Sequence, residues 1–469
     1  MHHTAFAALR AEIAALEPDH RVGRVTAVEG DLVRVAGLSS RARLGDLLEI
    51  RRHGAETLTG EVIRLADEDV SMLPDEVPTG VTLGQPVMLK NARDIAPGDG
   101  WIGRIIDPFG RPLDGRPLLR GEHGRPLRAN PPSPSRRHPL GARLETGMAA
   151  FNTLLPIARG QRLGLFAGSG VGKSSLLGHL GRNMDADIVV FALIGERGRE
   201  LRAFVDEVLG PEGMRRSVVV AATSDQSPLV RRRCAWAAMS IAEHFRDVGR
   251  HVLLLADSVT RFAEAHREVA TAAGELPALR GFPASTAHQI MSLCERAGPG
   301  ADAAGDITAL FSVLVAGSDM DEPVADILRG VLDGHVVLDR EIAERGRYPA
   351  IDLLRSISRS LPRAASDTEN ELILQTRNLL GKYARSEAVV KAGLYVQGSD
   401  PDLDQALRVR DDLDAFIGEK ETVSAKNSFK RLEMILRRAT GSRRSASDLP
   451  SKAVQRPRGA VRVHTPPAA

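Results

Sequence analysis

The stretch AGSGVGKSS at residues 167–175 decides the fold, and it lies between the apolar run LGLF at residues 163–166 and a helix-patterned segment that continues to residue 183. A strand that enters a glycine-rich turn and then a helix leaves consecutive backbone N–H groups pointing inward, with the positive end of the helix behind them. Such a nest binds polyphosphate, because Lys173 has the reach to contact the β- and γ-phosphates and the Ser174 hydroxyl can ligate magnesium. The stretch therefore predicts a nucleoside triphosphate site made by Gly168, Ser169, Gly170, Val171, Gly172, Lys173, Ser174 and Ser175.

Ala167 stands where this motif usually has its first glycine. A methyl group is tolerated at that position if the residue keeps strand-like backbone angles. The alternative is a glycine-rich turn that binds nothing, and it is disfavoured because strand, turn, GKS and helix all occur in order.

Length and composition indicate a globular protein of about three domains, since 43% of the 469 residues are hydrophobic. The chain has no run of about 18 apolar residues, and its N-terminus MHHTAFAALR lacks a hydrophobic signal region, so we expect a cytoplasmic protein. The net charge of +3 creates no global field that would favour nucleic acid. Cys234 and Cys294 are expected as core thiols rather than as a disulfide.

The first part of the chain divides into three segments by pattern. Residues 1–20 contain a short amphipathic helix, which either docks a partner or packs on its own domain; its apolar stripe is Phe6, Leu9, Ile13 and Leu16. Residues 21–92 consist of short β-branched runs separated by glycine, a pattern that predicts a small β-barrel or sandwich. Residues 93–146 are rich in turn residues and predict a connector.

The remainder of the chain predicts an α/β domain followed by helices. Within residues 93–365, apolar strand-like runs alternate with helical patterns, which indicates a parallel sheet covered on both faces; the runs are QRLGLF, DIVVFALIG, SVVVAATS, HVLLLADS, ITALFSVLVAG and HVVLD. Residues 366–440 predict a helical domain. The basic, proline-rich tail at residues 441–469 has no periodicity and is expected to be a disordered, solvated tail or, alternatively, a contact for acidic lipid or a partner.

Two acidic residues come directly after apolar strands. Asp257 ends the run HVLLLAD, where a carboxylate can hold magnesium through its water shell or cap the helix that follows. Glu196 follows DIVVFALIG and so emerges at the same sheet edge as Lys173, where it can orient the water that attacks the γ-phosphate. Surface pairing of Glu196 with Arg197 or Arg199 is the alternative interpretation.

At the level of whole motifs, the chain closely resembles the type III protein-export ATPases, and within them the flagellum-specific ATPases. The resemblance spans roughly residues 20–440 and rests on the strings GLFAGSGVGKSSLL, ALIGERGRE, TSDQSPLVRRR, LLLADSVTRFAEAHRE, LDGHVVLDREIAERGRYPAIDLLRSISR and GRIIDPFGRPLDG. It implies an N-terminal β-barrel, a RecA-like P-loop NTPase domain and a C-terminal helical domain, related to the catalytic subunit of rotary ATP synthases and assembled as a homohexamer.

The resemblance also assigns roles to individual residues. It makes Lys173 and Ser174 the phosphate-loop pair, Glu196 the catalytic glutamate with Arg197 beside it, and Asp257 the magnesium-associated acid. Tyr348 matches the tyrosine that stacks on adenine, and an ordinary core tyrosine is the less favoured alternative. Arg359 matches an arginine finger that reaches the γ-phosphate of the neighbouring subunit; without the resemblance it reads as a surface arginine.

The partners and location follow from the same resemblance. It implies MgATP hydrolysis that energises export of flagellar proteins, in the cytoplasm and peripherally associated with a membrane export apparatus. The implied partners are a regulator docked on the N-terminal helix, export-gate and stalk proteins, and export substrates with their chaperones. No nucleic acid is expected.

Three alternative functions remain at this level. The first is a virulence-type secretion ATPase, which shares these motifs. Overall similarity favours the flagellar enzyme, but no single residue distinguishes the two. A proton-coupled synthase subunit needs a distinct non-catalytic partner in its ring. This chain carries both Glu196 and Arg359, the two residues of a complete site, and that favours a homohexamer. A ring-shaped RNA translocase needs aromatic side chains in its barrel for base stacking, and residues 21–90 contain no Phe, Tyr or Trp.

Overall fold

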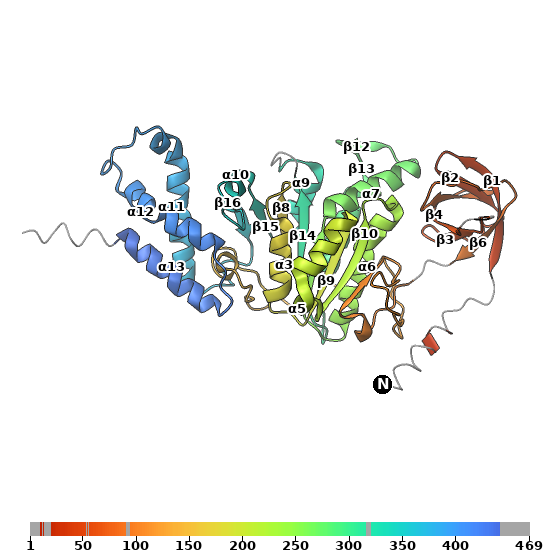
Figure 1. Cartoon of the computed structure of the whole chain (residues 1–469), viewed down its shortest axis with the longest axis horizontal. Coiled ribbons are helices and arrows are strands. Elements are labelled where there is room, and N and C mark those ends of the chain that lie inside the picture. The colour runs from red at the N-terminus through yellow and green to blue at the C-terminus, as the bar shows by residue number, and fades with distance from the viewer. Residues whose placement is uncertain are drawn as a thin grey trace, which may run out of the picture.

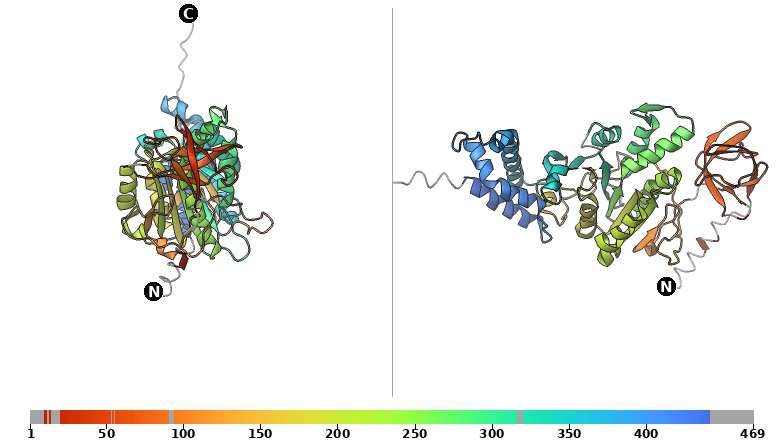
Figure 2. Two further views of the ribbon diagram at one scale, coloured as in Figure 1. Left: turned by 90° about the vertical axis from the view of Figure 1, so that its right-hand side faces the viewer. Right: turned by 45° about the horizontal axis from the view of Figure 1, so that its top comes forward.

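The computed structural model describes residues 20–52, 54, 56–90, 94–315 and 320–440, together with residues 10, 11 and 13. The molecule is elongated, with a β-barrel at one end, a sheet flanked by helices in the middle and a group of helices at the other end (Figure 1). The views in Figure 2 agree on this order along the long axis. The tail at residues 441–469 and most of residues 1–20, where the amphipathic helix is predicted, lie outside the described residues.

Six antiparallel strands close the barrel in the order β1-β2-β5-β4-β3-β6. Side chains alternate between interior and surface, as in β2, where Val33 and Val35 are buried and Arg34 between them is exposed. This alternation is what the β-branched runs predict, and the predicted barrel is confirmed. The strands are β1 (Arg21–Glu29), β2 (Leu32–Ala36), β3 (Leu47–Ile50), β4 (Leu58–Leu65), β5 (Asp69–Pro74) and β6 (Pro86–Lys90).

The central sheet has the strand order β16-β15-β8-β14-β11-β9-β10-β7. All neighbouring strands are parallel except β15 and β16, which are antiparallel. The six predicted runs form β8 to β11, β14 and β15, whereas β7 and β16 extend the two edges and were not predicted. The strands are β7 (Arg104–Ile106), β8 (Arg162–Ala167), β9 (Ile188–Glu196), β10 (Ser217–Thr223), β11 (Val252–Asp257), β14 (Ile307–Leu314), β15 (Gly334–Leu338) and β16 (Ile351–Ser358).

Helices cover both faces of this sheet, which explains why its strands are apolar on both sides. In β9, Val189, Phe191 and Leu193 join the cluster that contains α3, while Val190 and Ala192 join the cluster that contains α6 and α7. The elements around the sheet are η1 (Asp99–Trp101), α2 (Ala149–Asn152), α3 (Lys173–Asn183), α4 (Gly198–Ala203), the π-helical η2 (Phe204–Leu209), α5 (Gly210–Met214), α6 (Pro228–Asp247), α7 (Val259–Ala272), the hairpin β12 (Pro277–Leu279) and β13 (Phe282–Pro283), α8 (Ser285–Arg296), α9 (Pro323–Val331) and α10 (Arg340–Glu344).

Three helices follow the sheet: α11 (Asp367–Lys391), α12 (Pro401–Gly418) and α13 (Ala425–Thr440). A capping box starts α11, because the Ser366 hydroxyl accepts from the Glu369 amide and the Glu369 carboxylate accepts from the Ser366 amide. Apolar residues of all three helices belong to the same buried cluster as α3, so the helical region and this face of the sheet share one core.

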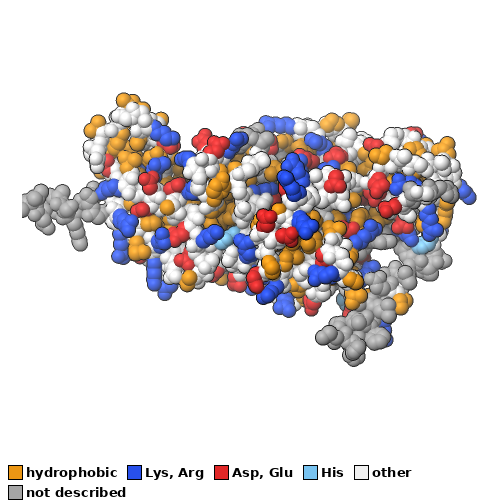
Figure 3. Space-filling model, viewed as in Figure 1, with side chains coloured by type: hydrophobic (Ala, Val, Ile, Leu, Met, Phe, Trp, Pro, Cys, Tyr) orange, Lys and Arg blue, Asp and Glu red, His pale blue; other side chains and the backbone are white. Residues whose placement is uncertain are grey.

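Cys234 and Cys294 are both buried and unpaired, as predicted for core thiols. Basic and acidic side chains are intermixed over the face shown in Figure 3, in keeping with the small net charge. In the described part of the chain, no helix combines the length and the hydropathy required to cross a membrane.

Candidate functional site

The loop at residues 168–172 joins β8 to α3 at the carboxyl edge of the sheet. Gly170 and Gly172 have φ angles of 79° and 86°, in the left-handed region that glycine adopts without strain. Val171 is buried, while the hydroxyl-bearing Ser174 and Ser175 are exposed at the start of α3. The loop therefore presents backbone groups and two hydroxyls at a helix N-terminus, which is the arrangement that binds phosphate.

Lys173, Asp257 and Glu196 meet beside this loop. The Lys173 Nζ donates directly to Asp257 Oδ1 and lies 4.0 Å from Glu196 Oε1. Ser312, on β14, donates its hydroxyl to the same Asp257 oxygen at 2.7 Å. These groups converge because β8, β14, β11 and β9 are consecutive in the sheet and parallel, so their carboxyl ends lie together.

Glu196 has an unusual protonation equilibrium. Burial raises the pKa of Glu196 to about 7, and the negative charge of Asp257 adds to this effect, while Lys173 opposes it. Glu200, in α4, raises the pKa further. A carboxylate with a pKa near the working pH is well matched to accepting a proton from water.

A pocket of about 550 Å³ opens next to the loop. Its walls include Leu176 of α3, the consecutive residues Tyr348 and Pro349, and Lys420 from the segment between α12 and α13. Tyr348 is 53% exposed, so it is not a core residue. A Cβ placed on Gly172 would lie 3.0 Å from the Tyr348 ring, which shows how closely this ring approaches the loop.

The segment that carries Lys420 is bound to the start of the nucleotide domain through its backbone. The Ala149 amide donates to the Glu419 carbonyl at 3.0 Å, and the Glu421 amide donates to the Gly147 carbonyl at 3.0 Å. Lys420 is thereby held on the wall of the pocket by main-chain hydrogen bonds between two distant parts of the sequence.

The two predicted arginines do not join this cluster within one chain. Arg197 is exposed and its guanidinium lies 3.1 Å from Glu200. Arg359 follows β16, and its amide donates to the Asp333 carbonyl at 3.0 Å, just before β15 begins. Because β15 runs parallel to β8, Arg359 lies where these strands begin, whereas the loop lies where they end.

Three residues of the site were missed by sequence reasoning. Ser312 is one of two hydroxyl residues in the mainly apolar strand β14, with Thr308, and it is the one nearer the carboxyl end of the strand, where the site lies; that position is a usable signal. Glu200 follows Glu196 within the GERGRE segment, but only the fold shows that their carboxylates interact. Lys420 carries no local signal, because its place depends on how the helical region packs.

Comparison with known proteins agrees with this geometry. The ATP synthase alpha/beta family nucleotide-binding domain matches residues 147–358, and the T3SS EscN ATPase C-terminal domain matches residues 365–434. The flagellum-specific ATP synthase of Caulobacter vibrioides is 44% identical over 440 residues, covering 91% of this chain and 99% of the relative.

Two solved structures extend the similarity to three dimensions. The assembled ATPase EscN of the enteropathogenic E. coli type III secretion system matches with a TM-score of 0.81 and 36% identity, over 88% of this chain and all of the other. The same ATPase in complex with its central stalk EscO matches with a TM-score of 0.80, also at 36% identity and over the same shares of both chains. The chain therefore belongs to the family of flagellum-specific ATP synthases, enzymes that bind and hydrolyse ATP.

Proposed function

We propose that this chain hydrolyses MgATP at the interfaces of a homohexamer and that hydrolysis energises the export of flagellar proteins during flagellum assembly. The observation that carries the proposal is the placement of Lys173, Asp257 and Glu196 at one sheet edge while Arg359 lies at the other. A nucleotide site built in this way is incomplete within one chain and is completed by a neighbour.

The phosphate chain is bound by the backbone amides of residues 168–172 and by Lys173. Glu196 positions the attacking water and accepts its proton, and its raised pKa suits that role. Arg197 neutralises Glu200 and so limits the repulsion that Glu200 exerts on the ionised Glu196.

The residues at the loop fit a magnesium ion. The Ser174 hydroxyl is exposed and the Asp257 carboxylate is held in place by Ser312, so both donors are hard oxygens of the kind magnesium prefers. Among the described residues no group of three or more His, Cys, Asp or Glu could hold a metal, and two donors suit an ion that also binds phosphate oxygens. The ion would neutralise charge on the phosphates.

Tyr348 supports the adenine ring in the adjoining pocket. Its ring lies against the loop at Gly172 and is half exposed, so a flat face is available for stacking. Lys420 and Leu176 form further parts of the wall around the base.

Arg359 completes the neighbouring site in the hexamer. Its guanidinium is exposed and has one hydrogen bond within the described residues, a 3.4 Å contact to the Arg329 carbonyl. An arginine supplied across an interface contributes about 10³- to 10⁵-fold to the rate. Isolated subunits should therefore hydrolyse ATP poorly.

Sizing of the full-length protein, combined with an ATPase assay, tests this proposal. Specific activity should rise with protein concentration and with MgATP as rings form, and Arg359→Ala should lose about 10³-fold or more in kcat while still forming rings. Dilute monomer, verified by sedimentation, with the same specific activity as the ring would overturn the trans arrangement.

The wider partners rest on the family relationship. The solved complex of EscN with its stalk EscO supports a stalk protein in the ring of this chain as well. We also propose a regulator docked at the N-terminus, export-gate proteins, substrates with their chaperones, and a cytoplasmic location at the periphery of the membrane apparatus. Loss of filament assembly on deletion, without loss of any injectisome, would separate flagellar from virulence-type export.

A further inference from the structure

Arg359 begins a turn at residues 359–366, here called the arginine turn, that leads from β16 to α11. Its first part is anchored to the nucleotide domain by two buried hydroxyls. Ser358 and Ser360, on either side of Arg359, both donate to the Pro156 carbonyl, at 2.6 and 3.0 Å. The backbone at Arg359 is thus held on both sides.

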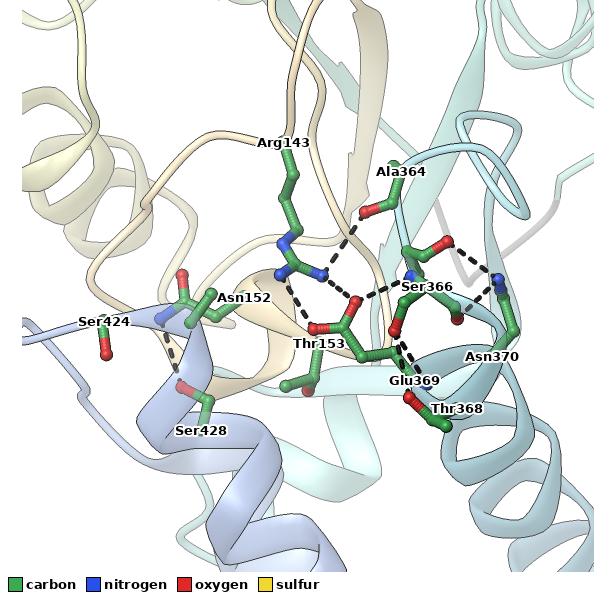
Figure 4. A network of polar contacts seen from close by, with 12 residues as sticks. Arg143, Asn152, Thr153, Ala364, Ser366, Thr368, Glu369, Asn370, Ser424 and Ser428 are labelled. Atoms are coloured by element: carbon green, nitrogen blue, oxygen red, sulfur yellow. Dashed lines mark hydrogen bonds and ion pairs between the residues drawn. The ribbon is translucent and has the colours of Figure 1, made fainter.

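The last part of the arginine turn is anchored to the first turn of α11 (Figure 4). The Ser366 amide donates to the Glu369 carboxylate at 2.9 Å. The Asn370 side-chain amide donates to three carbonyls of the turn, at 3.0 to 3.1 Å; they belong to Pro362, Ala365 and Ser366. A helix cap satisfies only the free N–H groups of the helix. The bonds from Asn370 also hold carbonyl groups of the turn, so they fix the turn itself.

Arg143 connects the two ends of the arginine turn, because its side chain contacts the end next to α11 and its backbone lies near the residues that hold the other end. Its guanidinium donates to the two carboxylate oxygens of Glu369 at 3.1 and 3.0 Å and to the Ala364 carbonyl at 3.4 Å, as Figure 4 shows. It also lies over the Phe429 ring of α13, 5.0 Å from its centre. The backbone of Arg143 pairs with Ala158, close to the Pro156 carbonyl that holds the other end of the turn.

The Arg143–Glu369 pair is a strong contact by its geometry and its surroundings. Two parallel N–H···O bonds set the relative orientation of both groups as well as their distance. The side chains are 19% and 22% exposed, so solvent screens the pair only in part. Burial opposes ionisation of Glu369, but the hydrogen bonds from Arg143 and Ser366 outweigh it and lower the pKa of this carboxyl.

In Arg359 the backbone is held in place, whereas the side chain is exposed. Its backbone belongs to this fixed frame, while its guanidinium is exposed beside a cavity of about 620 Å³ that Arg143 and Glu369 also line. A rigid backbone with a projecting guanidinium is what an arginine needs if it must reach a reacting group on another subunit.

We propose that Glu369, held by Arg143 and assisted by Asn370, is a positioning residue that aims Arg359 at the nucleotide site of the neighbouring subunit. This inference rests on the proposed role of Arg359 as an arginine finger. It adds which contacts hold the arginine turn in place. It also makes the start of α11 part of the catalytic geometry of the adjacent site, since Glu369 and Asn370 both belong to that helix.

The first test is Glu369→Gln in the full-length protein, which keeps the shape of the side chain and removes its charge. Misplacing a catalytic group by about 1 Å costs up to about 10²-fold, so kcat should fall by roughly 10- to 100-fold with the KM for ATP unchanged. Glu371→Gln is the matched control, because Glu371 lies two residues along the same helix and is exposed. Its kcat should equal that of the unmodified protein.

Mixed rings decide whether the effect acts on the neighbour. Lys173→Ala subunits cannot hydrolyse ATP but keep the arginine turn, so mixing them with Glu369→Gln subunits should restore activity to several times the sum of the two alone. Arg359→Ala mixed with Lys173→Ala should recover in the same way, and Glu196→Gln mixed with Lys173→Ala should not.

The outcomes separate the two proposals. Failure of Arg359→Ala to recover in mixed rings overturns the trans finger itself. Recovery of Arg359→Ala without recovery of Glu369→Gln overturns the positioning role alone. If Glu369→Gln does not form rings, Asn370→Ala enters the same mixing experiment, because it loosens the turn without touching the ion pair, and its recovery or failure is read in the same way.

Discussion

The Lys173 ammonium and the Asp257 carboxylate are paired directly across the carboxyl edge of the central sheet, with side chains only 10% and 4% exposed. A triphosphate in the loop requires the same ammonium. We therefore expect nucleotide binding to exchange the carboxylate partner of Lys173 for phosphate oxygens, and Asp257, still held by Ser312, would then be available to a magnesium ion.

Lys173→Ala should abolish stabilisation by MgATP. At a ligand concentration of about 100 times Kd, binding to the native state raises the free energy of unfolding by about 2.7 kcal/mol, and the variant should lose nearly all of this gain. Thermal unfolding with and without MgATP measures the difference. Lys426→Ala, at an exposed position of α13, should keep the full gain; retention of the gain by Lys173→Ala would contradict the phosphate role.

Glu196→Gln should bind MgATP with nearly unchanged Kd and lose about 10²-fold or more in kcat, because the amide can orient water but cannot accept its proton. Nucleotide titration and single-turnover hydrolysis measure the two effects separately. Turnover that survives the substitution would show that another group is the base.

The pH dependence follows from the same carboxyl. With a pKa of about 7, Glu196 is protonated and inactive as a base below neutrality, so kcat/KM should rise with pH and level off about one unit above the midpoint. Because Glu200 raises this pKa, Glu200→Gln should move the midpoint to lower pH. Glu212→Gln, at a distant exposed position, should leave it in place. A profile that is flat from about one pH unit below the pKa of Glu196 to about one unit above it would contradict the assignment.

Tyr348→Ala should weaken ATP binding by about 1 to 3 kcal/mol, the range for stacking of a base on an aromatic ring. Tyr348→Phe keeps the ring and should bind as tightly as the unmodified protein. Inorganic triphosphate, which has no base, should bind equally to all three proteins. An equal loss for ATP and inorganic triphosphate would place Tyr348 against the phosphates instead.

The strands at the centre of the sheet could be predicted because burial on both faces demands continuous apolar runs, as in β11, where all six residues are buried. The edges could not. β16 exposes Leu354, Arg355 and Ile357, so its sequence has no continuous apolar run. β7 is three residues long and lies in a turn-rich segment, where only pairing with β10 defines it as a strand.

The site likewise has features that the sequence predicts and features that depend on the fold. Glu196 and Asp257 are strand-end acids and could be predicted from the sequence, because strand ends converge in a parallel sheet. The raised pKa of Glu196 could not, since it depends on burial and on Glu200. The contact of Arg143 with Glu369 joins residues that are far apart in sequence, and no local pattern indicates it.

The hydrogen bonds between residues 147–149 and 419–421 make the connection between α12 and α13 part of the wall of the pocket beside Tyr348. A displacement of these helices should therefore move the wall that Lys420 forms. If the base of ATP occupies this pocket, a partner that binds the helical end and displaces the wall should change the affinity for ATP, and ATP should change the affinity for that partner by the same free energy.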